Sequence, residues 1–272
     1  MFYECLIKIQ KQIIMSIIIA MANHKGGVAK TASVAALGTI FAAAGHRVLM
    51  VDLDTQANLT YSFINMEEKP PRRFVYNAML ERRSLPQVPV KENLFLVPSS
   101  LEMTVFEERM FAMRRREYLL QDILLPVDDK YDMILLDCPP SLGNMTTNAL
   151  VVADRLMVPM NTDQLSYNGL KMMQANVERM EDLNAHLKID DIFFTRYNKG
   201  EKLTEAWQKT VTDEFGEDVV MKTVIRRNNK VSDAVSHFCS IVDYAPESNG
   251  AQDYRALARE LSERLMKSQN KQ

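Results

Sequence analysis

The sequence predicts an α/β fold of the doubly wound type, in which helices cover both faces of a mostly parallel sheet. Three observations support this. Strand-like and helix-like stretches alternate along almost the whole chain, the strand-like stretches are continuous apolar runs, and no internal repeat or low-complexity linker interrupts them. Continuous apolar runs are typical of strands buried on both faces, and regular alternation with helices is typical of βαβ units.

The individual elements follow this alternation in order. The first strand is expected at residues 16–21, and residues 31–44, an alanine-rich helix, end at Gly45. Further strands are expected at residues 47–51, 94–97, 132–136, 155–159 and 189–194, and further helices at residues 101–124, 166–183, 202–215 and 251–267. The least regular stretch, residues 65–89, is interpreted as an insertion with one short helix.

Composition limits the class of protein. The chain has 272 residues, 47% hydrophobic and 25% charged residues and a net charge of −2, so any contact with nucleic acid must come from a local patch. Its three cysteines form no C-x-x-C pair, which argues against a disulfide framework or an iron–sulfur site and favours the cytoplasm. Residues 1–14 are expected to be a dispensable extension that is a poor signal peptide, and residues 15–272 a single domain.

The stretch ANHKGGVAKT, residues 22–31, follows the first expected strand and opens the first expected helix. It departs from the phosphate-loop pattern G-x-x-x-x-G-K-[ST] at His24 and Ala29. Gly26 and Gly27 still supply backbone freedom, and alanine at position 29 is expected to be mild because that position is taken as the first helical turn. Lys30 is therefore expected at the β- and γ-phosphates, and Thr31 at Mg²⁺.

Two later strands end in carboxylates. In VLMVDLD, residues 48–54, Asp52 and Asp54 share one side of the strand because residues i and i+2 point the same way. In MILLDCPP, residues 133–140, Asp137 ends an apolar strand and is expected to reach Mg²⁺ through a water. Three strand-end motifs in this order favour a nucleotide site.

Together these segments resemble a known family. KGGVAKT, DLDTQAN and LLDCPPSLG resemble the deviant Walker A, A′ and B boxes of the ParA/MinD family of P-loop ATPases, a SIMIBI-like group. Near the C-terminus, TVIRRNNKVSDAVSHFCSIVDY is similar to the P-R-N-x-x-x-S-E-A region of ParA partition proteins. The similarity extends over about residues 16–265.

The resemblance implies a set of roles in an ATP-bound sandwich dimer. Lys25 would cross to the partner's nucleotide, Asp54 would orient the attacking water, and Asp52 would lie beside the ligands of Mg²⁺ and the loop. ATP would be bound by Gly26, Gly27, Val28, Ala29, Lys30, Thr31, Ala32 and Asn228, and Mg²⁺ by Thr31, Asp52 and Asp137. Ala29 and Ala32 depart from the family pattern, and Ala32 is expected to weaken contact with the α-phosphate.

Within this family, DNA segregation is the expected function. The chain has no amphipathic membrane tail, tyrosine-rich tail or cysteine pair of the related groups, and no membrane contact is expected. A ParA-type dimer would bind DNA without sequence preference and act with a ParB-like partner. The expected DNA contacts are Arg227, Arg226, Lys230 and Lys199; the run of Arg114, Arg115 and Arg116 is an alternative more typical of a solvated face.

Two other functions stay open at this point. YNKGE, residues 197–201, approximates the N-K-x-D guanine motif, although Glu201 is one carbon longer than aspartate, so a GTP-dependent switch is possible. The alanines at positions 29 and 32 leave room for a scaffold that does not hydrolyse its nucleotide.

Overall fold

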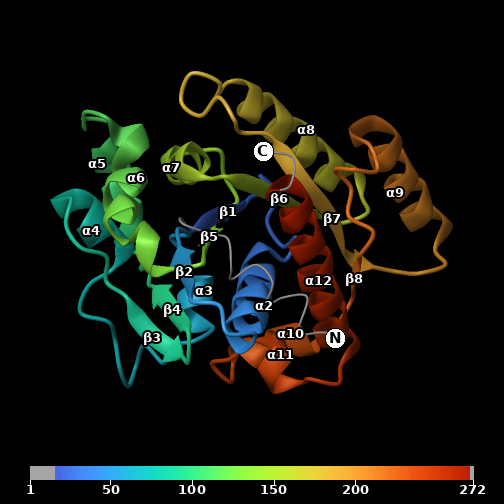
Figure 1. Cartoon of the computed structure of the whole chain (residues 1–272), viewed down its shortest axis with the longest axis horizontal. Helices are drawn as coiled ribbons and strands as arrows, with labels where there is room; N and C mark the ends of the chain where they lie inside the picture. The colour runs from blue at the N-terminus through green and yellow to red at the C-terminus, as the bar shows by residue number, and fades with distance from the viewer. Residues whose placement is uncertain (1–15, 270–272) are drawn as a thin grey trace.

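The computed structural model describes residues 16–269, so the expected extension at residues 1–14 lies outside the described residues. An eight-stranded sheet, in the order β3-β4-β2-β5-β1-β6-β7-β8, runs through the centre of the molecule (Figure 1). Its strands are β1 (Ile17–Met21), β2 (Val48–Asp52), β3 (Val88–Lys91), β4 (Leu94–Val97), β5 (Met133–Asp137), β6 (Arg155–Met160), β7 (Ile189–Tyr197) and β8 (Ile225–Arg226). All neighbouring pairs are parallel except β3 and β4.

Helices cover both faces of this sheet. They are α2 (Lys30–Ala43), α3 (Asn58–Tyr61), α4 (Val75–Glu81), α5 (Met103–Met110), α6 (Leu119–Leu124), α7 (Asn144–Val152), α8 (Gln164–Glu178), α9 (Lys202–Phe215), α10 (Lys230–Val235), α11 (Ile241–Tyr244) and α12 (Asn249–Gln269). Alternate residues of β1 point to opposite faces: Ile18 and Ala20 join the core under α4–α8, and Ile19 and Met21 join the core under α2, α11 and α12. The predicted doubly wound fold is confirmed.

Most predicted elements lie within a few residues of the observed ones, because each coincides with a continuous apolar run. The predicted helix at residues 101–124 is wrong: the chain forms α5, turns, and forms α6 after a 3₁₀ turn that begins at Arg116. The buried residues of α5 are Met103, Phe106 and Met110, and those of α6 are Leu119, Leu120, Ile123 and Leu124. These two apolar stripes are out of phase, so one straight helix could not bury both, and the chain reverses through Arg115 at a φ of +55°.

Several short elements were not predicted. The insertion does contain one short helix, α4, but it also ends in β3, which adds an antiparallel edge to the sheet. Helix α7 follows β5, and β8, α10 and α11 precede α12. Within residues 16–269, no helix combines the length and the apolar character needed to cross a bilayer.

The topology determines where a ligand can bind. Parallel strands place their carboxyl ends at one edge of the sheet, and ligands of doubly wound folds bind in the crevice outside that edge. The loops after β1, β2, β5, β6 and β7 therefore meet at this edge, and every strand-end motif of the sequence lies there.

Candidate nucleotide site

The loop between β1 and α2 has the backbone of an anion-binding turn. Gly27 has a φ of +71°, and Ala29, directly before α2, has a φ of +66° and a ψ of +28°. Left-handed conformations at such positions turn successive N–H groups into one concavity at a helix N-terminus. The expectation that Ala29 lies in the first helical turn is therefore wrong: it occupies a left-handed position that favours glycine.

Ala29→Gly is expected to raise the free energy of unfolding by up to about 1.5 kcal/mol. The left-handed conformation costs an L-residue about 1–2 kcal/mol, whereas the extra unfolded-state freedom of glycine costs about 0.5–1 kcal/mol. Ala43→Gly, at the exposed end of the same helix, is the matched control and is expected to lower stability. Urea unfolding checks this, and equal losses in both variants would contradict it.

Lys30 begins α2, and its side chain is buried inside the loop. Its Nζ donates to the backbone oxygens of Asn23, at 3.2 Å, and Lys25, at 3.1 Å. Burial lowers the pKa of the Lys30 ammonium from its ordinary value, although Asp137, the Cys138 thiol and Asp54 act in the opposite direction. The loop thus holds a cation among main-chain groups, ready for an anionic ligand.

Asp137 ends β5 and pairs in register with Asp52 at the end of β2 and with Met21 at the end of β1. It is fully buried, and no hydrogen bond of good geometry reaches either carboxylate oxygen from the described residues, although the Thr31 hydroxyl lies close enough to lower the pKa of Asp137. Burial and the Asp52 carboxylate raise the pKa of Asp137 well above its ordinary value, although Thr31 and Lys30 oppose the rise. A buried carboxylate without a partner is expensive unless a cation comes to it.

The two carboxylates after β2 have different surroundings. Asp52 accepts hydrogen bonds from the Asp54 N–H at 3.1 Å and from the N–H and hydroxyl of Thr60 at 2.8 and 2.7 Å, so it fixes the turn into α3. Burial is the main cause that raises the pKa of Asp52 to about 7. Asp54 lines the cavity beside the loop, and its Oδ1 accepts from the N–H of Gln56 at 2.9 Å.

The donor set fits a hard divalent cation. Mg²⁺ prefers oxygen ligands and is usually held by one or two protein groups together with substrate phosphates. The Asp137 carboxylate and the Thr31 hydroxyl are the groups that would hold it, and the two unpartnered oxygens of Asp137 are the observation that supports the fit. Asp52 has both oxygens engaged and would act by fixing the geometry around the metal. Within residues 16–269, no cluster of three or more His, Cys, Asp or Glu side chains is placed to hold a metal alone.

Lys25 lies at the outer side of the loop and is held by the start of α8. Its Nζ lies 2.7 Å from both oxygens of Asp163 and 3.1 Å from the Ser166 hydroxyl. Asp163 also caps α8 by accepting from the Ser166 N–H. The pKa of Asp163 is lowered, since the hydrogen bonds from Lys25 and Ser166 outweigh the opposing effect of burial.

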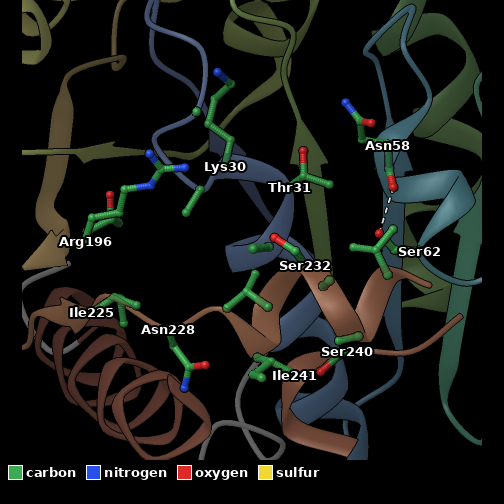
Figure 2. Close-up of a pocket in the computed structure, with 18 of the residues that line it drawn as sticks. Lys30, Thr31, Asn58, Ser62, Arg196, Ile225, Asn228, Ser232, Ser240 and Ile241 are labelled. Atoms are coloured by element: carbon green, nitrogen blue, oxygen red, sulfur yellow. Dashed lines mark hydrogen bonds between the residues drawn. The ribbon is translucent and has the colours of Figure 1, made fainter. Parts of the chain in front are cut away.

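A cavity of about 580 Å³ opens beside the loop (Figure 2). One part of its lining comes from the loop and the start of α2, including Gly26, Lys30 and Thr31. The other part comes from β8, α10, α11 and α12, and it combines apolar side chains with polar ones; it includes Ile225, Asn228, Val231, Ser232, Ile241 and Tyr254. The loop end, with its lysine and main-chain groups, suits the phosphates of a nucleotide, and the apolar side chains of the other end suit the faces of its base.

The residues predicted to bind DNA differ in whether their charge is already paired within the protein. Arg226 makes a bidentate ion pair with Asp253, with Nη2–Oδ1 and Nε–Oδ2 distances of 2.7 and 2.9 Å. Arg227 is exposed and lines the cavity, and Lys199 and Lys230 are exposed. Asn228 lines the cavity as expected, but its side chain contacts Asn249 and accepts from the Lys230 N–H at 2.8 Å.

The guanine-like motif does not face the cavity. Neither Asn198 nor Glu201 belongs to the cavity lining. The Glu201 carboxylate instead accepts from the Asn198 amide at 3.1 Å and from the Thr204 hydroxyl at 3.2 Å. These side-chain contacts connect the loop to the first turn of α9 and argue against recognition of a guanine base.

Sequence reasoning missed two residues of this site. Asp163, the partner of Lys25, lies between β6 and α8 and caps α8. An aspartate at a helix start, directly after a predicted strand, was a signal in the sequence that could have identified it. Arg196, near the end of β7, lines the cavity with φ at +51°. Nothing in the local sequence around Arg196 predicts this left-handed conformation.

Comparison with known proteins finds similarity over most of the chain. The family model described as an AAA domain matches residues 16–189. The chain is 38% identical to the chromosome-partitioning ATPase Soj of Treponema pallidum, over 89% of this chain and 96% of that protein. It is 34% identical to the chromosome partitioning protein ParA of Caulobacter vibrioides, over 91% of this chain and 94% of that protein.

A solved structure agrees in fold and carries a nucleotide. The cobyrinic acid a,c-diamide synthase of Mycobacterium smegmatis, crystallised with an ATP analogue and magnesium, matches with a TM-score of 0.78 and 29% identity, over 89% of this chain and 92% of that chain. By its name that protein is a synthase. The shared fold is therefore compatible with different activities, and function has to be argued from the site.

Proposed function

Because the chain belongs to the ParA/Soj/MinD-type family of AAA-domain ATPases, we propose that it is an ATPase of DNA segregation. It alternates between a monomer and an ATP-bound dimer that holds DNA. The observation that carries the proposal is one cavity lined by Lys30, Thr31 and Asp54, with the unpartnered Asp137 carboxylate close to Thr31 and Lys30. A plasmid, another mobile element or a chromosome is the cargo, moved on the nucleoid in the cytoplasm.

Each residue of the cavity has a separate task in ATP hydrolysis. Main-chain N–H groups of residues 26–32 bind the phosphates, and Lys30 leaves its carbonyl partners for the β- and γ-phosphates. Asp54, whose carboxylate is at the cavity wall, orients the attacking water. Thr31 and Asp137 would hold Mg²⁺, which would supply positive charge at the phosphates.

Lys25 completes the site of a second subunit. In the monomer its ammonium is paired with Asp163, at the rim of the loop. In the closed dimer it turns to the partner's nucleotide and stabilises charge on the transferred phosphoryl group, as an arginine finger does. Hydrolysis and dimer formation are coupled in this way.

DNA is held by exposed cations after β7 and β8. Arg227 follows β8 and Lys199 follows β7, and because these strands are parallel neighbours both residues lie at the same edge of the sheet. Neither they nor Lys230 has a carboxylate partner in residues 16–269, whereas Arg226 is neutralised by Asp253 and is withdrawn as a DNA contact. A ParB-like protein that binds the cargo stimulates hydrolysis and releases the dimer.

Arg227→Ala is expected to weaken binding of the ATP-bound dimer to duplexes of every sequence and to reduce the salt slope by about one. Titrations of fluorescent duplexes at several salt concentrations measure both. Because Arg227 also lines the cavity, ATP affinity is measured for the same variant. Lys130→Gln, an exposed cation just before β5 at the opposite edge of the sheet, is the matched control. An unchanged slope in Arg227→Ala would contradict its role at DNA.

The decisive test of the proposed function is retention of the wild-type protein on DNA, which should require ATP and end with hydrolysis. A larger rise in melting temperature with GTP than with equal ATP would favour the GTP-dependent switch instead. Single-turnover assays that show bound but uncleaved ATP in the presence of DNA and partner would favour a scaffold.

A further inference from the structure

A bulge at the end of β7 turns Arg196 out of the strand. Thr195 lies opposite Ile225 of β8, and Tyr197 lies opposite the next residue, Arg226, so Arg196 is the extra residue of the bulge. Its φ of +51° is a left-handed conformation that a β-bulge usually assigns to glycine. Arginine therefore occupies a strained position, and such positions cluster at functional sites, where they redirect a side chain.

The redirected side chain is exposed at the wall of the nucleotide cavity. Arg196 belongs to the cavity lining, and Figure 2 shows its guanidinium extending from the end of β7 toward Lys30 and the start of α2. The preceding residue, Thr195, is fully buried, and its hydroxyl lies 3.2 Å from the backbone oxygen of Val28 and 2.9 Å from Asn161 Oδ1. Thr195 thus fixes the end of β7 against the phosphate loop, and this contact also fixes the backbone position of the next residue, Arg196.

The charges of the cavity leave this guanidinium without a counter-ion. Lys30 donates to loop carbonyls, and Arg226 is paired with Asp253. Among the described residues that line the cavity, Asp54 is the only acidic one. Arg196 has neither an ion pair nor a side-chain hydrogen bond in residues 16–269. An arginine of this kind, aimed at a phosphate loop, carries a planar guanidinium that can donate two hydrogen bonds to two oxygens of a phosphate group.

We propose that Arg196 is a phosphate-binding residue of the nucleotide site, supplied by the end of β7 beside the loop. It serves the phosphate nearest the ribose, where Ala32 lines the cavity without a hydroxyl to donate. The inference rests on the proposed binding of ATP at this cavity. The Arg196 guanidinium would thus replace the hydrogen-bond donor that is missing because position 32 is alanine.

Binding of adenosine, ADP and ATP to the wild type, Arg196→Gln and Arg196→Gly tests the proposal by calorimetry. Both variants should lose about tenfold to a hundredfold in affinity for ADP and ATP and keep the wild-type affinity for adenosine. Arg196→Gly should not melt below the wild type, because glycine accepts the left-handed bulge. Lys202→Gln, an exposed cation at the start of α9 outside the cavity lining, is the control that should change none of these values.

The outcomes separate the possible failures. Unchanged ADP and ATP affinities in both variants would overturn the proposal, and so would an equal loss for adenosine, which would place the guanidinium against the base. A melting temperature of Arg196→Gly well below the wild type, with affinities reduced for all three ligands, would make Arg196 a structural residue. If the wild type itself bound none of the three, the proposed function would fall and this inference with it.

Discussion

Replacing Lys25 with alanine is expected to leave ATP binding nearly unchanged and to reduce hydrolysis in the dimer by about 100-fold or more. The reason is geometric: the Lys25 ammonium is paired with Asp163 at the rim of the site, whereas the phosphates are bound by main-chain groups and Lys30 of the same subunit. This pair is partly exposed, so its loss should change the melting temperature little. Equilibrium ATP titration and single-turnover hydrolysis with DNA measure the two effects separately.

A mixing experiment decides whether Lys25 acts in the partner's site. Lys25→Ala and Asp54→Ala are each expected to be inactive alone. In a mixed dimer, the Lys25→Ala subunit keeps its own Asp54 and receives Lys25 from the other subunit, so that site is complete. Random mixing should therefore restore about a quarter of the wild-type rate.

If Lys25 acted within its own subunit, no mixed dimer would contain a complete site and the mixture would stay inactive. Loss of ATP binding in Lys25→Ala would equally contradict the assignment. Asp163→Asn is the matched control: asparagine still caps α8 but no longer holds the ammonium by charge, so hydrolysis should persist.

The sequence predicts the sheet well because each buried strand is a continuous apolar run bounded by turn residues. The strand at 94–97 and the helix at 202–215 match β4 and α9. The prediction fails at residues 101–124, where every residue is compatible with a helix and only the phase of the buried stripe changes between α5 and α6. Secondary structure there is decided by which face each segment buries, and a local pattern does not contain that information.

The residues of the site also fall into two groups, those that the sequence predicts and those that it does not. Lys30, Thr31, Asp54 and Asp137 are predictable because strand order and parallel direction bring strand ends together. The partner of Lys25 and the conformation of Ala29 depend on contacts between distant segments. Arg196 depends on a bulge that exists only once β7 has paired with β8. These features come from tertiary structure, and no motif records them.

Asp137→Asn is expected to raise the melting temperature of the nucleotide-free protein at pH 8 by several degrees and to abolish the effect of Mg²⁺ on ATP binding. The Asp137 carboxylate is fully buried beside the Asp52 carboxylate, so removing its charge relieves the desolvation and the repulsion that raise its pKa. The same substitution removes the negative charge and one of the two oxygens that would meet the metal. In the wild type, Mg²⁺ with ATP should raise the melting temperature more than ATP alone, and in the variant the two should be equal.

The dependence on pH gives an independent check of the same prediction. Asp137 and Asp52 both have a pKa raised in the folded state, to about 7 for Asp52. A folded state that binds protons more tightly than the unfolded chain loses stability as pH rises from the ordinary aspartate pKa of about 4 through the raised values. The nucleotide-free protein should therefore melt at a higher temperature near pH 5 than near pH 8, and Asp137→Asn should flatten this slope, leaving the part due to Asp52. Asp129→Asn, an exposed carboxylate shortly before β5, should leave the wild-type slope intact. A variant at position 137 that melts lower than the wild type at pH 8 would show that the carboxylate has a stabilising partner, and a metal would then no longer be needed to satisfy it.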